Sequence, residues 1–179
     1  MSGIAEILVA AGSAGSASPI AKRAITNLNV LNEAYDYAKP SSFSRGMRID
    51  MNGVAMLLIS GTASIDENGV SLHVGDFRAQ QRRTYDNITA LLASEGATWH
   101  DIVRTTCYLR DIERDYEAFN EERTAFFQQL GLNPVPASTG IQAILCRPEL
   151  LIEIEAIAIF RTDGQTAATR IPAADAAKE

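Results

Sequence analysis

Apolar and polar residues alternate over residues 47–50 and 54–60, which is the pattern of β-strands that bury one face. Asn52-Gly53 separates the two segments and favours the positive φ angles of a tight turn, so they are expected to form a hairpin. Further strands are expected over 103–110, 138–146 and from residue 150 onward.

Apolar residues recur at helical spacing in two longer segments. The first covers 77–95, with Asp76 placed to cap its start and Gly96 to end it. The second covers 115–130 and ends before Gly131. The order β-β-α-β-α-β-β predicts an α+β fold in which two helices cover one face of a mixed sheet. Because no third helix is available for the opposite face, that face is expected to be covered by self-association.

The last expected strand, residues 149–160, carries two carboxylates in an otherwise apolar run. Side chains alternate between the faces of a strand, so Glu153 and Glu155 share one face and lie roughly 7 Å apart. A carboxylate between Leu151 and Ile157 is poorly solvated, which raises its pKa and suits general acid or base catalysis. The alternative is that both glutamates form salt bridges or point into water from an edge strand.

Length and charge set the broad class of the protein. The chain has 179 residues, of which 46% are hydrophobic, and this suits one well-packed domain. We expect an N-terminal extension over 1–27, the domain over 28–161 and a flexible tail over 162–179. The net charge of −6 argues against a nucleic-acid or anionic-membrane surface. No apolar run reaches the length of about 20 residues that spans a bilayer.

The cysteines and histidines give no sign of a metal site. Cys107 and Cys146 lack metal spacing and a CxxC pair, and are expected to be reduced and buried in a cytoplasmic protein. His73 and His100 have no ligand partners at metal spacing. Neither a metal nor a cofactor is therefore expected.

A combination of short strings runs through residues 40–161: Ile59-Ser-Gly61, Ile102-Val-Arg-Thr-Thr-Cys-Tyr-Leu-Arg-Asp111, Phe119-Asn120, Pro136-Ala137 and Ile152-Glu-Ile-Glu-Ala-Ile-Ala158. Together they resemble the YjgF/Rid family of reactive intermediate deaminases, also called endoribonuclease L-PSP. The resemblance implies a chorismate-mutase-like α+β subunit and a homotrimer with a central barrel and clefts between subunits. It also implies cofactor-free hydrolysis of small carboxylated enamines and imines, such as 2-aminoacrylate, to ketoacids and ammonia.

The family's cleft motifs fall on four residues, namely Ser60, Gly61, Asn120 and Glu153. The resemblance implies that Glu153 orients the attacking water while the other three contact the substrate. Phe43 stands where the deaminases usually have Tyr. Ser138 replaces the arginine that clamps the substrate carboxylate in the deaminases, and a hydroxyl cannot make the same bidentate contact. This departure argues against standard imino-acid deaminase activity.

A second set of strings resembles the C-terminal half of chorismatases: Ser60-Gly-Thr-Ala-Ser-Ile65, Ala137-Ser-Thr-Gly-Ile141 and Cys146-Arg-Pro-Glu-Leu-Leu-Ile-Glu-Ile-Glu155. Those enzymes release pyruvate by hydrolysing an enolpyruvyl ether. The resemblance implies that Glu153 protonates the methylene carbon. In this reading Arg147 or Arg45 would hold a carboxylate, and we expect Thr139, with Ser60 and Gly61, to provide polar and backbone hydrogen bonds to the substrate. Cys146 would either take part in the chemistry or be a packed thiol.

The sequence therefore predicts a homotrimeric hydrolase that acts on an enamine, imine or enol ether of a small carboxylated metabolite. Deamination and pyruvate release both stay open. So does a non-catalytic ligand-binding or chaperone-like trimer. RNA cleavage is a fourth reading, and the pI of about 5.0 weighs against it.

Overall fold

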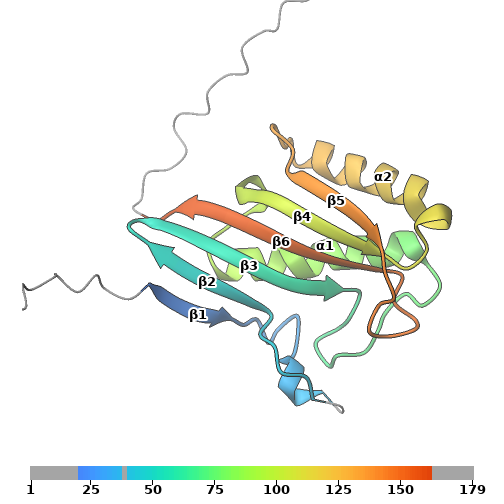
Figure 1. The fold of residues 1–179 in the computed structure, drawn as a ribbon, viewed down its shortest axis with the longest axis horizontal. Helices are drawn as coiled ribbons and strands as arrows, with labels where there is room; N and C mark the ends of the chain where they lie inside the picture. The colour runs from blue at the N-terminus through green and yellow to red at the C-terminus, as the bar shows by residue number, and fades with distance from the viewer. Residues whose placement is uncertain (1–19, 38–39, 163–179) are drawn as a thin grey trace, which may run out of the picture.

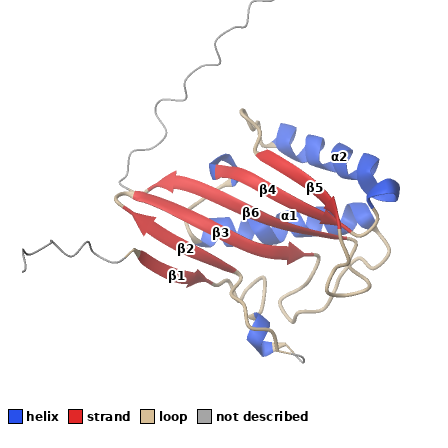
Figure 2. Cartoon of the chain, in the orientation of Figure 1, coloured by secondary structure: helices blue, strands red, loops and turns tan. Residues whose placement is uncertain are grey.

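The computed structural model describes residues 20–37 and 40–162. Six strands form one sheet in the order β1-β2-β3-β6-β4-β5 (Figures 1 and 2). The strands are β1 (Ala21–Ile25), β2 (Gly46–Met51), β3 (Val54–Ala63), β4 (Ile102–Leu109), β5 (Ala137–Gln142) and β6 (Ile152–Arg161). The helices are α1 (Phe77–Ser94) and α2 (Ile112–Gln129). Strands β4 and β5 pair in parallel, and the other neighbours are antiparallel.

The two long helices pack on one face of the sheet, as predicted (Figure 1). Alternate residues of the central strands form the core with apolar residues of the helices: Leu57, Ile59, Leu109, Ile152, Ile154, Ile88, Leu91 and Phe119. All eight are 3% exposed or less, so the central strands are closed to solvent on this face. We call the opposite side the helix-free face.

Local chemistry explains where the elements begin and turn. The β2–β3 hairpin forms at Asn52 and Gly53, whose φ angles of 47° and 79° lie in the left-handed region. Asp76 caps α1 by accepting a hydrogen bond from the amide of Ala79. Asp111 caps α2 in the same way, which starts this helix three residues before the expected residue 115.

The sheet contains one strand that the sequence pattern did not predict. Strand β1 lies within the segment 1–27 that was expected to be an extension, and it pairs with β2 from Ala21–Asp50 to Ile25–Gly46. Of its residues only Ile25 is buried, so β1 has little of the alternation that marks a strand. The rest of the expected extension, up to residue 19, lies outside the described residues, as does the expected tail from residue 163.

The helix-free face leaves large apolar side chains open to solvent. Leu58 of β3, Ile141 of β5 and Ile159 of β6 are 37%, 41% and 39% exposed. Every residue of the edge strand β5 is also exposed. Such surfaces are costly to leave in water, which supports the expectation that another copy of the chain covers them.

Candidate functional site

Glu153 lies on β6, in the interior of the sheet. In the strand register it stands opposite Ala63 of β3 and Tyr108 of β4. The alternation along β6 places Glu153 and Glu155 on the helix-free face, since Ile152 and Ile154 are buried against the helices. The alternative of an edge strand is therefore wrong. Within residues 20–37 and 40–162, no side chain forms a salt bridge with Glu153.

Gly61 makes room for this carboxyl group. The pairing of β3 with β6 is interrupted between Ile59 and Thr62, so Ser60 and Gly61 form a bulge next to Glu153. A Cβ atom on Gly61 would lie 2.0 Å from Oε1 of Glu153 and 2.9 Å from its Cδ. The side chain of Glu153 can occupy its position only because residue 61 has no side chain.

The substitution Gly61→Ala is expected to displace the Glu153 carboxyl while the strand stays formed. If Glu153 is the catalytic group, kcat should fall roughly a hundredfold, because misplaced catalytic groups lose rates of that order. Gly140→Ala is the matched control, since a Cβ atom at residue 140 meets nothing within 4 Å. Steady-state kinetics and thermal unfolding of both variants measure the effect. Full activity of Gly61→Ala would contradict a role for Glu153 in this position.

The surroundings of Glu153 favour its neutral form. Desolvation, and then the negative charge of Glu155, raise the pKa of Glu153 above its ordinary value of 4.5. Desolvation also raises the pKa of Tyr108, with further contributions from Glu155 and Glu153. A raised pKa brings the neutral form of a carboxyl group closer to the working pH, which suits a group that must both donate and accept a proton. The expected acid or base chemistry is thus physically available to this residue.

The segment 143–150 covers Glu153 from the helix-free side. Leu145 and Leu150 pack with Ala63 and Tyr108 in a small apolar cluster. Cys146 belongs to this segment, and burial and the charge of Glu153 raise the pKa of its thiol. Cys146 is nevertheless exposed, which corrects the expectation that both cysteines are buried. It is exposed because the chain leaves the sheet after Gln142 and loops over Glu153, instead of continuing as a strand to residue 146.

Arg45 is a structural residue. It is 4% exposed, and its guanidinium donates to the carbonyl of Asn32 (Nε to O, 2.8 Å) and to the hydroxyl of Tyr37. Its Cζ also lies 5.5 Å from the ring centre of Phe43. Phe43 thus packs on Arg45. The structure does not support the expectation that Arg45 binds a substrate carboxylate.

Arg147 has a similar role. Its Nη1 donates to the carbonyl of Gly69 at 2.6 Å and to the hydroxyl of Ser71 at 3.2 Å. Its Cζ lies 5.1 Å from the centre of the Tyr37 ring. These contacts of Nη1 tie the segment over Glu153 to the loop before α1, so Arg147 holds that segment in place.

Two residues that were expected to contact the substrate form hydrogen bonds within the chain instead. The hydroxyl of Ser60 donates to the carbonyl of Ser44 at 2.7 Å, which holds the bulge beside Gly61. The hydroxyl of Thr139 accepts from Arg104 at 3.2 Å on the helix-free face. Thr139 is on β5 and Glu153 on β6, with β4 between them, so one chain does not bring the two together.

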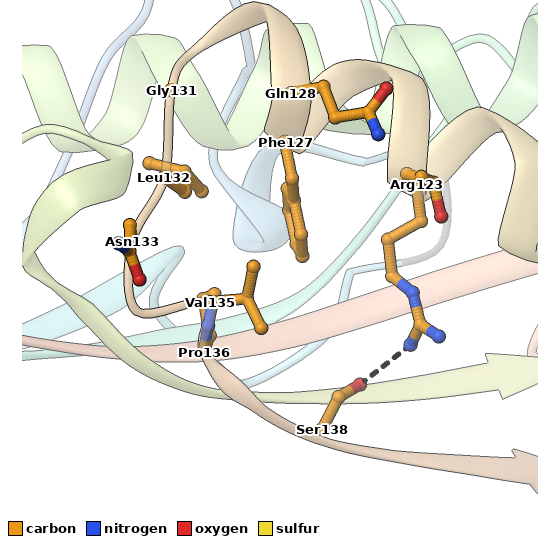
Figure 3. Close-up of a pocket in the computed structure, with 10 residues that line it drawn as sticks. Arg123, Phe127, Gln128, Gly131, Leu132, Asn133, Val135, Pro136 and Ser138 are labelled. Carbon is orange, nitrogen blue, oxygen red and sulfur yellow. Dashed lines mark hydrogen bonds between the residues drawn. The ribbon is translucent and has the colours of Figure 1, made fainter. Parts of the chain in front are cut away.

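Ser138 lies at a cavity of about 630 Å³ between the end of α2 and β5 (Figure 3). Its hydroxyl accepts hydrogen bonds from Thr105 at 3.0 Å and from Nη1 of Arg123 at 3.2 Å. Arg123 Nη2 donates to Oδ1 of Asn120 at 2.5 Å. The structure therefore brings Asn120 and Ser138 together around an arginine that sequence reasoning missed.

The expected site residues fall into two groups on opposite faces of the sheet. Glu153, Gly61 and Cys146 are on the helix-free face, whereas Ser138 points to the side of α2 and contacts Arg123 there (Figure 3). A signal for Arg123 existed in the sequence, because it follows Asn120 by three residues and so shares its helix face. Tyr108 was also missed, since its pairing with Glu153 needs the strand register.

Two negative findings apply to residues 20–37 and 40–162. No group of three or more His, Cys, Asp or Glu side chains is arranged to hold a metal ion there. The helices of that part are also too short or too polar to cross a membrane.

Comparison with known families agrees with this fold and these motifs. The family model described as Endoribonuclease L-PSP matches residues 37–160. This range covers most of the chain and includes both groups of site residues. The chain therefore belongs to the Endoribonuclease L-PSP family, which is the YjgF/Rid family expected from the sequence.

Individual relatives support the assignment. The chain is 33% identical over 103 residues to 3-aminoacrylate deaminase RutC of Acinetobacter baylyi, a match that covers 58% of this chain and 78% of the relative. It is 31% identical over 102 residues to a RutC family protein of Pyrococcus abyssi, covering 57% and 76%. Among solved structures, the YjgF gene product of E. coli is similar with a TM-score of 0.62 and 27% identity, covering 78% of this chain and 99% of that chain.

Proposed function

We propose that the protein is a deaminase that hydrolyses small carboxylated enamines or imines to ketoacids and ammonia. The observation that carries the proposal is Glu153, a carboxyl group with a raised pKa and no salt bridge to a described residue, for which Gly61 keeps space. The similarity to 3-aminoacrylate deaminase RutC supports the reaction type.

The reaction needs one group that moves protons in both directions. In its neutral form, Glu153 donates a proton to the carbon of an enamine, which gives the protonated imine. As a carboxylate, it accepts a proton from water, and the water oxygen adds to the imine carbon. The resulting carbinolamine loses ammonia when its nitrogen is protonated and its hydroxyl is deprotonated, which leaves the ketoacid. A pKa above the ordinary value extends the pH range in which the neutral form of Glu153 is available as a proton donor.

We propose that the complete cleft lies between copies in a homotrimer. Glu153 and Ser138 belong to opposite faces of one sheet, so a substrate that touches both must sit between two chains. The exposed apolar residues Leu58, Ile141 and Ile159 on the helix-free face support burial by another copy.

A second candidate is release of pyruvate from an enol ether, because the same proton transfer to carbon begins that reaction. Cys146 supports this second candidate, because it lies near enough to Glu153 for their charges to interact. RNA cleavage has less support, since the net charge of −6 repels a polyanion. A trimer that only binds ligands would leave Glu153, which has no salt bridge within residues 20–37 and 40–162, without a function.

The proposal is tested by mixing the purified protein with 2-iminopropionate, generated in place by an amino-acid oxidase, and measuring ammonia release. The expected result is release faster than the spontaneous hydrolysis in buffer. Pyruvate release from chorismate is measured in parallel. Release of pyruvate without imine hydrolysis would favour the second candidate. No product in either assay would favour a protein that only binds ligands.

A further inference from the structure

The cavity beside Ser138 holds a cation without a counter-charge. Arg123 contributes its guanidinium to the lining (Figure 3). In the part of the chain that the structure describes, no carboxylate lies within salt-bridge distance of it. The neighbouring Glu122 instead pairs with Arg78 and Arg82 of α1. A half-buried, unpaired guanidinium in a cavity is suited to bind an anion.

Three contacts fix the guanidinium of Arg123 in place. Its Cζ lies 4.6 Å from the ring centre of Phe119, and its two Nη atoms donate to Ser138 and Asn120. The amide nitrogen of Asn120 donates to the carbonyl of Tyr116 at 3.1 Å, so its oxygen is turned toward Arg123. A guanidinium has five N–H donors, and two hydrogen bonds leave others for a ligand. Because Arg123 is already oriented, binding costs it little further entropy.

The rest of the cavity lining has an apolar part beside the polar side chains of Thr124, Gln128 and Asn133. Phe127, Leu132, Val135 and Pro136 contribute to the wall, and Phe127 and Leu132 are themselves buried (Figure 3). A volume of about 630 Å³ accommodates a small molecule with a charged end and an apolar end. The charge selects an anionic group, and the wall selects an aliphatic side chain.

We propose that Arg123 binds the carboxylate of the substrate and that the apolar wall holds its side chain, which makes 2-imino acids with apolar side chains the substrate class. The assignment of a substrate class rests on the proposed function. The binding of a carboxylate by Arg123 does not depend on it. Residue 138 on β5 is a serine, so Arg123 of α2 provides the guanidinium at this position instead.

Binding is tested with 4-methyl-2-oxopentanoate and its uncharged amide, by calorimetry or by NMR titration. The wild type is expected to bind the acid at least about tenfold more tightly than the amide, because hydrogen bonds to charged groups are worth that much or more. Arg123→Gln should lose this difference while it binds the amide unchanged. Equal binding of the acid by both proteins, or no binding by the wild type, would overturn the inference.

Arg82→Gln is the matched control. It removes the same charge from an exposed arginine, and Glu122 keeps its salt bridge to Arg78. This variant is expected to bind the acid like the wild type. If Arg82→Gln weakens binding as much as Arg123→Gln, general charge rather than a specific contact explains the effect, and the assignment of Arg123 fails.

Turnover separates the two proposals. With the imine formed from leucine, Arg123→Gln should show a kcat/KM about a hundredfold lower, mainly through KM, as expected for loss of two charged hydrogen bonds. The wild type should prefer this imine to the one formed from aspartate by tenfold or more. A wild type that binds the acid through Arg123 but hydrolyses no imine would refute the proposed reaction and keep the binding site. An unaffected Arg123→Gln enzyme, or a preference for the aspartate imine, would refute the inference and keep the reaction.

Discussion

Glu153→Gln is expected to lower kcat for imine hydrolysis roughly a thousandfold, since general acid and base groups contribute about 10² to 10⁴ in rate. Glutamine keeps the shape of the side chain next to Gly61 but cannot exchange a proton. KM should change little, because the proposed binding of the substrate carboxylate is by Arg123 and not by Glu153. Steady-state kinetics with freshly generated imine measure both constants.

The pH profile identifies the group behind this loss. In the wild type, the acid limb of kcat/KM should have an apparent pKa above 4.5, because burial and Glu155 raise the pKa of Glu153. Glu155→Gln removes the second of these causes, so its acid limb should move to lower pH. An acid limb that stays in place in Glu155→Gln would show that a different group titrates.

Stability provides the control for correct folding. A raised pKa means that folded Glu153 holds its proton at pH values where the unfolded chain, with a pKa near 4.5, has lost it. Its contribution to the free energy of unfolding is therefore fully present below pH 4.5 and declines as pH rises through the folded pKa. Glu153→Gln has no such decline, so at neutral pH it should be at least as stable as the wild type in thermal unfolding.

Two inactive variants are expected to restore each other's activity when they assemble together. If Glu153 of one copy and Arg123 of another form each site, a trimer mixed from Glu153→Gln and Arg123→Gln chains contains some sites with both native residues. Random co-assembly of equal amounts gives about a quarter of the sites. Activity at low substrate should thus rise to about a quarter of the wild-type value, measured after refolding the two chains together.

The control for this experiment uses two substitutions at residues that one chain contributes together to the site. Gly61 and Glu153 lie next to each other in one chain, so mixing Gly61→Ala with Glu153→Gln should restore nothing. Recovery in this control would show that assembly alone changes the activity. Absence of recovery in the test mixture would show that Glu153 and Arg123 do not meet across a subunit boundary.

The sequence predicted the elements whose apolar pattern is strong. The hairpin at Asn52-Gly53, the capped helix after Asp76 and the alternation along β6 were all confirmed. The alternation also predicted that Glu153 and Glu155 share one face, whereas the structure shows that this face is the one without helices. Each of these features depends on residues close together in the chain, so local physical rules are sufficient.

The missed features depend on contacts between distant segments. Arg45 was expected in a substrate site, yet its burial by Asn32 and Tyr37 depends on how a loop folds back on itself. The role of Arg123 depends on α2 packing beside β5, which places its guanidinium at Ser138. The exposed strand β1 lacks an apolar pattern because it is at the edge of the sheet. Such contacts follow from the tertiary fold, and a single sequence does not show them.

The opposite faces of the sheet keep two reactive charges from neutralising each other. Glu153 and Arg123 belong to the same chain, and if they met within it they would form an ion pair. Such a pair would lower the pKa of Glu153 and occupy the guanidinium. The sheet separates the two side chains, so they form no ion pair within one chain. The carboxyl group therefore remains available for proton transfer, and the guanidinium remains available to bind an anion. In the proposed trimer the substrate, with its own carboxylate, is the molecule that would stand between the two.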